Sequence, residues 1–305
     1  MVANSSETRL AYVAESTWGT TPSSPSFQTA RWTSESLTPS LQTVTSSEIR
    51  ADRNVTDLVE TGFQAGGDVS FELSFDSFEE LFESLLYNTW STNVLKNGKT
   101  EKSFTFEKTF DMDTDNYHRF PGSIIDTMSL DIQAQSIVTG TFGILSKEMT
   151  TAQSKISNAT YSSANTNQVL NASSQFANLA MSNLSNTPTI TGLTLNVANN
   201  LRQQSAVGQK GSIGIGTGRF EVTGTLNAYF ENKDLMDALL NNTATPLTFR
   251  LGTGTDYYDI TLPKIKFSSG QTVAGGNDED VIAEMEFTAL YDSAEDATMK
   301  IERPS

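Results

Sequence analysis

Alternating hydrophobic and polar positions predict two similar β-strands in distant parts of the chain. The first runs from Val69 to Phe75, where every second residue is apolar and the residues between are polar. The second runs from Phe220 to Phe230 and keeps largely to the same period of two. This period is typical of a strand that buries one face and leaves the other in water.

After each strand the period changes to that of a short amphipathic helix. Residues 77–88 place their apolar side chains, from Phe78 to Leu86, on one helical stripe, and residues 233–241 carry a similar Leu-rich pattern. The order strand, turn, helix therefore occurs twice, which indicates a scaffold built by duplication. We align the two copies so that Gly224 of the second takes the place of Val69 in the first.

Further strands and loops are expected around these two elements. The same reasoning predicts strands at 46–53, 102–110, 124–134, 137–145 and 193–197, with polar loops at 54–66 and 203–217. We divide the chain into an extended N-terminal arm (1–30), a first half (31–149), an insertion (150–188) and a second half (189–305). The insertion is rich in Asn, Ser and Thr, and Lys155 is the only charged residue between Glu148 and Arg202. We expect it to be a long loop, a partly helical excursion or a segment ordered by a partner.

Composition excludes several classes of function. The formal net charge is −16, and such a surface repels nucleic-acid phosphates rather than gripping them. The chain has no cysteine, which excludes disulfides, thiolate catalysis and cysteine-bound metals. It has no signal-peptide pattern and no apolar run near the roughly 20 residues that span a bilayer, so we expect synthesis in the cytosol and no membrane binding.

Candidate chemical motifs are weak. The single histidine, His118, has no recognisable partner for acid–base catalysis. The acidic run from Asp111 to Asp115 resembles the start of a calcium loop, but Gly122 stands where the bidentate glutamate is required. The glycines from Gly214 to Gly218 lack the lysine of a phosphate-binding loop. We therefore expect no enzyme, no cofactor and no metal site. The polar strand faces either meet solvent or line a channel, and the residues alone leave both open.

Several short motifs, in their order and spacing, resemble the tail tube (major tail) proteins of long-tailed, non-contractile bacteriophages. The resemblance covers nearly the whole chain except 150–188. It rests on Tyr12-Val-Ala-Glu-Ser-Thr-Trp-Gly-Thr-Thr-Pro22, Ser46-Ser-Glu-Ile-Arg-Ala-Asp-Arg53, Gly66-Gly-Asp68, Arg219-Phe-Glu-Val-Thr-Gly224, Tyr229-Phe-Glu-Asn232, Leu262-Pro-Lys264, Ala289-Leu-Tyr-Asp292 and Lys300-Ile-Glu-Arg303.

The resemblance implies a mainly β (α+β) fold: a duplicated tail-tube-like β-sandwich or barrel with long lumen hairpins and a short flanking helix in each half. Family members form hexameric rings that stack into a tube around the tape-measure protein, and the tube later conducts double-stranded DNA during ejection. A tail terminator and baseplate proteins are the other implied partners. The implied location is the virion tail, reached from the host cytoplasm during assembly.

Carried onto this chain, the resemblance implies lumen hairpins at about 44–76 and 193–230, with four strands for each subunit and about twenty-four in a hexamer. The lumen-facing candidates are Glu48, Arg50, Asp52, Ser70, Glu72, Ser74, Arg202, Glu221, Thr223 and Thr225. The inter-subunit candidates are Arg53, Tyr12 and Trp18. Loops 54–66 and 203–217 are expected to contact the adjacent ring, and the insertion to lie outside the tube or at a ring–ring contact.

Two other functions stay open at this point. One is a related virion ring, such as a tail terminator, a head–tail connector or a baseplate ring. The other, from a different class, is an acidic two-domain module that binds carbohydrate or another surface.

Overall fold

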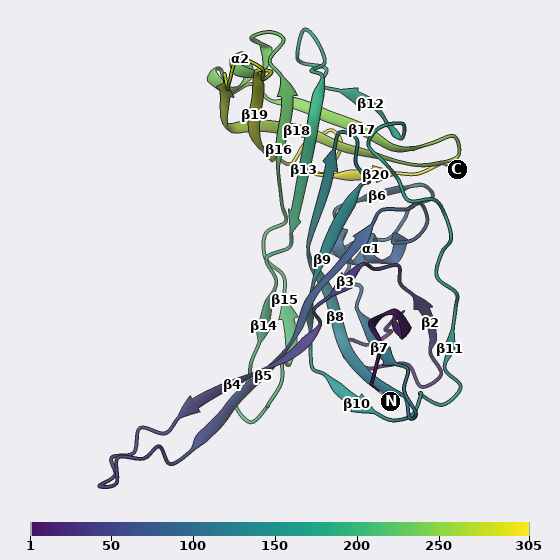
Figure 1. Cartoon of the computed structure of the whole chain (residues 1–305), viewed down its shortest axis with the longest axis vertical. Helices are drawn as coiled ribbons and strands as arrows, with labels where there is room; N and C mark the ends of the chain where they lie inside the picture. Colours follow the sequence, from purple (N-terminus) through teal and green to yellow (C-terminus); the bar gives the residue numbers. More distant parts are fainter. Residues whose placement is uncertain (1, 305) are drawn as a thin grey trace.

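β-Strands make up most of the regular structure in the computed structural model, which describes residues 2–304 (Figure 1). The helical elements in this range are the short 3-10 turn Ser5–Glu7 and the helices α1 (Glu79–Leu86) and α2 (Asp234–Leu240). The strands up to residue 152 are β1 (Thr8–Ala14), β2 (Ser26–Thr29), β3 (Ser34–Glu35), β4 (Thr38–Thr45), β5 (Leu58–Glu72), β6 (Val94–Lys96), β7 (Phe104–Phe110), β8 (Asn116–Gln133), β9 (Thr139–Ser146) and β10 (Thr150–Ala152). The others are β11 (Thr160–Tyr161), β12 (Phe176–Ala180), β13 (Ile190–Ala198), β14 (Arg202–Gln204), β15 (Gly214–Gly216), β16 (Glu221–Tyr229), β17 (Thr245–Thr253), β18 (Asp256–Val273), β19 (Ile282–Ala289) and β20 (Lys300–Glu302).

Eight of these strands form one continuous antiparallel row, which we call the main row. Its order is β4–β5–β9–β8–β13–β16–β19–β18. The first four strands come from the first half of the chain and the last four from the second half. The β8–β13 ladder joins the two halves, and the row is open at both ends within the described residues.

The two halves of the main row have the same connectivity. In the first half β5 is followed by α1, and β7, β8 and β9 then pair in sequence. In the second half β16 is followed by α2, and β17, β18 and β19 do the same. The strands β8 and β18 are each 18 residues long, and each pairs along its first part with an outer strand and along its last part with the main row. The fold is mainly β, as expected, and the repeated pattern is visible in its ladders.

The main hydrophobic core lies beneath the main row and draws residues from Leu10 to Ile301. In the first half Phe71 stacks on Phe142, with 4.5 Å between the ring centroids. Tyr258 from the second half meets Phe82 of α1 edge to face at 5.8 Å. The two halves therefore share buried aromatic surface, and separating them would expose it to water.

Both predicted helices are confirmed. The apolar stripe of α1 is buried, from Leu81 to Leu86, because the helix covers the inner side of the sheet. Glu79 and Glu80 occupy its first turn, where carboxylates favour the positive end of the helix dipole. The C-cap residue Tyr87 adopts a left-handed conformation with φ 51°, which ends the helix after Leu86.

Residues 1–30 were expected to form an extended arm, but within this range β1 is an inner strand of a sheet. It pairs with β7 along its whole length and with β2 on its other side. Tyr12, at its centre, is 1% exposed and packs against Phe104 and Phe106. Leu10, Ala11 and Tyr12 are buried in succession, so this strand shows no period of two in the sequence.

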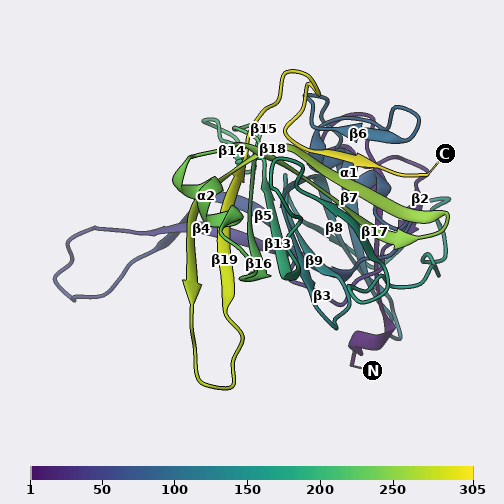
Figure 2. The ribbon, with the colours of Figure 1, turned by 90° about the horizontal axis from the view of Figure 1, so that it is seen from above.

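The strand expected at 46–53 is also wrong. Residues 46–57 form the tip of a long hairpin whose strands are β4 and β5, so much of the loop expected at 54–66 is strand instead. Every residue of β4 is exposed, and this two-stranded part has no buried face to produce an apolar period. Figure 2 shows the hairpin and the β18–β19 connection projecting from the body in different directions.

Residues 150–188, which we call the strap, run along one side of the molecule from β10 to β12 (Figure 1). The strap pairs with both halves, through β10 on β8 and through β12 on β17. The hydroxyl group of Tyr161 donates to the buried carboxylate of Glu107 at 2.6 Å, and Leu170 is 2% exposed. These contacts attach the strap to the rest of the chain.

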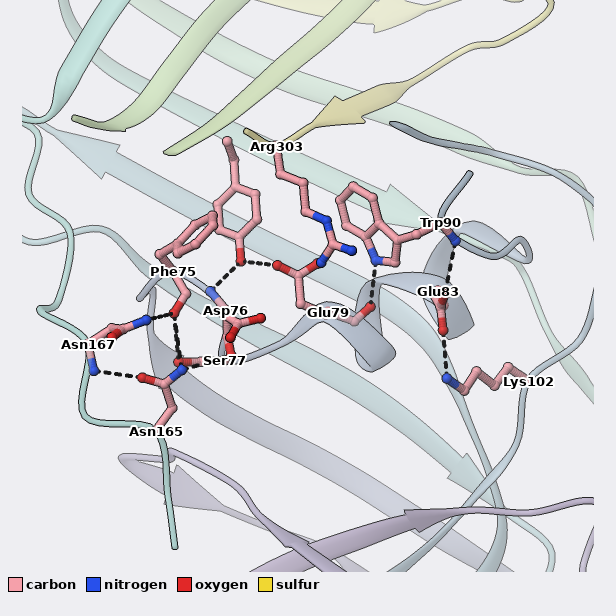
Figure 3. Close-up of polar contacts among 11 residues, drawn as sticks. Phe75, Asp76, Ser77, Glu79, Glu83, Trp90, Lys102, Asn165, Asn167 and Arg303 are labelled. Carbon is pink, nitrogen blue, oxygen red and sulfur yellow. Dashed lines mark hydrogen bonds and ion pairs between the residues drawn. The ribbon is translucent and has the colours of Figure 1, made fainter. Parts of the chain in front are cut away.

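A polar network beneath α1 connects the strap, the first half and the second half (Figure 3). Asn165 and Asn167 of the strap donate their side-chain amides to the carbonyl groups of Asp76 and Phe75 at 2.8 and 2.9 Å. The backbone N–H of Asp76 donates to the hydroxyl oxygen of Tyr258 at 2.9 Å.

The second part of this network centres on Glu79. Tyr258 donates its hydroxyl proton to Glu79 Oε1 at 2.8 Å, and Arg303 lies 3.1 Å from Glu79 Oε2 while it stacks on the ring of Trp90. Burial raises the pKa of Glu79, an effect opposed by the Tyr258 hydrogen bond and by Arg303. The network therefore holds the C-terminal residues and β18 against α1.

We expect Tyr258→Phe to lower the free energy of unfolding by about 1–3 kcal/mol, because a part-buried N–H and a part-buried carboxylate both lose a partner. Thermal unfolding followed by circular dichroism measures this change. The matched control is Tyr291→Phe, which removes an exposed hydroxyl bonded to Asp296 and should cost less than about 0.5 kcal/mol. Equal losses in the two variants would contradict a linking role for Tyr258.

Candidate functional site

The side of the main row that faces away from the core is polar across both halves. Strand pairing fixes which side chains are neighbours on this side. One row of directly opposed residues runs Ser70, Thr141, Ser129, Asn196, Thr223, Thr288 and Lys266. The next runs Glu72, Thr139, Asp131, Thr194, Thr225, Glu286 and Ser269.

We call this surface the polar face. Besides those two rows it carries residues on either side of them, namely Asp68, Thr127, Gln133, Glu221, Asn227, Gln271 and Glu284. It forms because strands alternate sides, so the apolar residues between these positions point into the core. In β16, for example, Val222, Leu226 and Ala228 are 0% exposed, while Thr223 is exposed.

The polar face has an excess of negative charge. Six of its members are carboxylates: Asp68, Glu72, Asp131, Glu221, Glu284 and Glu286. Lys266 is the one cationic residue in the two complete rows, and Arg219 next to the face forms an ion pair with Glu221. That pair lowers the pKa of Glu221, mainly through the hydrogen bond from Arg219, so this carboxylate stays ionised.

Short polar contacts hold the side chains of the face in place. Ser70 and Thr141 share a hydrogen bond of 3.1 Å, and Gln133 donates to Asp131 at 2.8 Å. In the second half Gln271 donates to Glu284 at 2.7 Å. These contacts order the polar side chains, and the surface they form is hydrophilic.

The hollows on the polar face are open and shallow. One, of about 450 Å³, lies over β5, β8 and β9 beside Glu72 and Asp131. Another, of about 320 Å³, lies over the β16, β19 and β18 strands beside Asn227 and Glu284. Neither has the enclosed apolar lining of a small-molecule site. Within residues 2–304 no group of three or more acidic or histidine side chains is arranged to hold a metal ion.

The structure places five of the ten lumen-facing candidates on the polar face. They are Ser70, Glu72, Glu221, Thr223 and Thr225. The predicted lumen-facing position of Ser74 is wrong. Its side chain is 0% exposed and shares a hydrogen bond with Ser77 at 2.7 Å, because the chain leaves the strand at Glu72 and turns towards α1.

The other four candidates lie away from the polar face. Glu48, Arg50 and Asp52 are in the hairpin tip, and Arg50 pairs with Asp52 at 2.8 Å. Their expected alternation along a strand is wrong because these residues form a loop. Arg202 begins β14, whose small hairpin with β15 continues beyond β13 and β16.

The three inter-subunit candidates have different environments. Tyr12 is corrected to a core residue, since it has no surface to offer a neighbour. Trp18 packs within its own chain, where its indole N–H donates to the carbonyl of Gly122 at 3.2 Å and Lys147 lies over the ring. Arg53 is exposed in the hairpin tip.

Sequence reasoning missed Asp131, Glu284 and Glu286, although a strand was expected at 124–134, where Asp131 lies. The alternation was present: Asp131 stands between Leu130 and Ile132, which are both buried. The missing information was the order of strands, because only pairing brings Asp131 into one row with Glu72 and Glu286.

Within the described residues, no helix is long and apolar enough to cross a membrane. A search of curated proteins gave no significant match to the sequence. A family model for phage tail tube proteins matches residues 5–289, which is nearly the whole chain and includes every strand of the main row. The chain therefore belongs to the phage tail tube protein family, a family of structural proteins of the virion tail.

Proposed function

We propose that the polar face is the inner wall of the tail tube and that double-stranded DNA passes over it during ejection. The observation that carries this proposal is the continuous, hydrated and anionic surface that spans both halves of the main row. Carboxylates repel DNA phosphates, and Lys266 is the one cation in the two complete rows, so the wall offers the double helix few cations on which to bind and stop. Small hydroxyl and amide side chains keep the surface smooth and wet.

We propose that rings of this chain close edge to edge and stack into a tube. The resemblance implies a wall of about twenty-four strands, and the expected contribution was four strands from each of six chains. Each chain brings eight strands to the main row. Three chains, which contain six halves, therefore supply the same number, about twenty-four strands. We favour a ring of three chains. Six whole chains would give about forty-eight strands and a tube about twice as wide.

The projecting parts of the chain are suited to contacts between rings. The β4–β5 hairpin extends from the body together with the loop between β14 and β15 (Figure 1). Lys210 of that loop accepts a hydrogen bond from the Phe63 N–H at 3.0 Å and pairs with Glu60 at 2.9 Å, so the two elements support each other. We propose that they reach the next ring, while the tape-measure protein fills the lumen before ejection and the terminator and baseplate proteins cap the ends.

Electron microscopy of the purified protein, alone and with the tape-measure protein, tests the proposal. We expect long hollow tubes, and end-on averages should show six equal lobes made by three chains. Isolated rings that never stack would favour a terminator, connector or baseplate ring. A protein that stays monomeric at high concentration under both conditions would sink the tube assignment. Native mass spectrometry of single rings separates three chains from six.

We expect the triple variant Glu72→Lys, Asp131→Lys, Glu286→Lys to slow DNA ejection at least about 10-fold at low salt, because new cations on the wall bind phosphates. The slowing should disappear as salt is raised, since released counterions drive this attraction. Single-particle ejection assays on assembled phage measure the rate.

The matched control reverses three exposed carboxylates away from the polar face: Asp111→Lys, Glu231→Lys and Asp256→Lys. It makes the same change in net charge and should eject at the parent rate. If both triple variants eject as the parent does at low salt, the charge of the polar face has no role in DNA passage.

A further inference from the structure

The main row ends in two strand edges that have no neighbour within the described residues. At one end β4 pairs only with β5, and at the other the last part of β18 pairs only with β19. Residues 38–45 and 271–274 are exposed on both edges. Free edges of this kind pair readily with another strand.

The internal repeat relates these two edges to a ladder that already exists. Gly67 of β5 lies opposite Ile144 of β9, and Gly224 of β16 lies opposite Phe287 of β19. Ile144 pairs with Ile125 and Phe287 pairs with Phe267, each just before a shift in register, so the two glycines occupy equivalent positions in the two halves. Since β3 and β4 pair with β5 as β13 pairs with β16, β3 and β4 together are the equivalent of β13.

A shared irregularity makes the β18 edge equivalent to β8. The pairing of β8 with β9 shifts register after Ile125, and that of β18 with β19 shifts after Phe267. If the two shifts are superposed, Ile125 corresponds to Phe267, and four residues further on Ser129 corresponds to Gln271. By the glycine alignment, Thr38 is the equivalent of Asn196.

Within one chain Ser129 lies directly opposite Asn196 in the β8–β13 ladder that joins the halves. We propose that the same ladder recurs between chains: residues 269–273 of one copy pair antiparallel with residues 36–40 of the next, with Gln271 opposite Thr38. This inference rests on the proposed tube function and specifies its lateral contact. The occupant of each edge is thus a second copy of this chain, and the contact is head to tail.

The side chains on the two edges are compatible with this register. Ser269 and Gln271 would meet Ser40 and Thr38, which places no like charges opposite each other. The polar face would then continue from one copy to the next without a seam. A slip of one residue would turn these side chains towards the core and is therefore disfavoured.

At Leu37, just before β4, side chains of the same chain occupy the outward backbone groups. The backbone N–H of Leu37 donates to Glu35 Oε2 at 2.9 Å, and its carbonyl accepts from Lys108 Nζ at 2.6 Å. Because the Ser36 N–H donates to Asp68, alternation turns the backbone of Leu37 and Pro39 outward, and Pro39 has no N–H to offer. These features blunt the edge before assembly, and Glu35 and Lys108 must release Leu37 when the copies pair.

Cysteine cross-linking tests the register, and the chain has no cysteine of its own. By the same alternation Thr38 and Gln271 form a non-hydrogen-bonded pair, whose Cα separation of about 4.5 Å suits a disulfide. We expect tubes of Thr38→Cys, Gln271→Cys to give a ladder of covalent oligomers on non-reducing gels after oxidation. The positive control is Ser129→Cys, Asn196→Cys, which should close a disulfide within one chain.

Two results would overturn the register. One is tubes in which the Thr38 and Gln271 variant stays monomeric on oxidation while the control closes its internal bond. The other is oligomers from the off-register variant Gln42→Cys, Gln271→Cys in place of the expected one. If the substituted chain does not assemble, cryo-electron microscopy of unmodified tubes identifies the strand beside β4, and any strand other than β18 refutes the pairing. Failure of the unmodified chain to form tubes would instead count against the proposed function.

Discussion

Gly224→Val is expected to lower the free energy of unfolding by about 3 kcal/mol or more and to remove most of the soluble protein. A Cβ atom at Gly224 would lie 2.3 Å from the carbonyl oxygen of Thr194 and 2.4 Å from Cζ of Phe287. The first neighbour is backbone of the adjacent strand, so relief requires the β13–β16 ladder to move. The second is a buried ring that fills the space left by the missing side chain.

The glycine argument has a matched control in the same chain. A Cβ at Gly211 would meet only the carbonyl oxygen of Lys147 at 3.6 Å, an ordinary contact, so Gly211→Ala should change stability by less than about 1 kcal/mol. Gly224→Ala should already be clearly less stable than Gly211→Ala. Thermal unfolding and soluble yield measure both, and a Gly224→Val protein that melts within about 1 °C of the parent would contradict the close packing described.

The same glycine shows what the sequence pattern could and could not determine. Alternation correctly gave the buried face of β5 and β16, and the two helices that follow them. It aligned Gly224 with Val69, whereas the ladders make Gly224 equivalent to Gly67. A period of two fixes which face a residue occupies, but a shift by two residues leaves every face unchanged. Only the pairing with β9 and β19 removes that ambiguity.

Elements without a buried face were beyond the reach of hydrophobic patterning. The strand β4 and the outer part of β5 are exposed on both sides, so the expected strand fell on residues 46–53 of the tip instead. The strand β1 was not predicted for the opposite reason: Leu10, Ala11 and Tyr12 are all buried in succession and give no alternation. In both cases neighbouring strands decide the conformation, not the local pattern.

Part of the polar face could also be predicted from alternation, and part of it could not. Residues on strands with one buried face, such as Glu72 and Thr225, could be placed on the polar face from alternation. The carboxylates Asp131 and Glu286 were equally visible in their strands, but their relation to Glu72 depends on long-range strand order. The joining of eight strands of one chain into the main row could not be predicted for that reason.

Polar substitution of the projecting hairpin is expected to abolish tubes at working concentrations without changing the fold of the chain. Leu41, Val44 and Val59 are 57%, 57% and 48% exposed, and Val44 lies directly opposite Val59 in the hairpin. Exposed apolar surface of this kind marks contact sites, and a two-stranded hairpin is marginally stable by itself. We therefore expect the hairpin to be buried by a neighbouring copy in the tube.

The variant Leu41→Thr, Val44→Thr, Val59→Thr keeps residues that favour strands while it removes apolar surface. Burying the exposed half of three such side chains is worth about 3 kcal/mol, so the critical concentration for tube growth should rise about 100-fold. Sedimentation of tubes against monomers measures it, and Leu240→Thr, Tyr291→Thr is the control with exposed apolar residues elsewhere. Tubes at the parent concentration would show that the hairpin carries no contact. A lower melting temperature of the monomer would show instead that these three side chains stabilise the fold of their own chain.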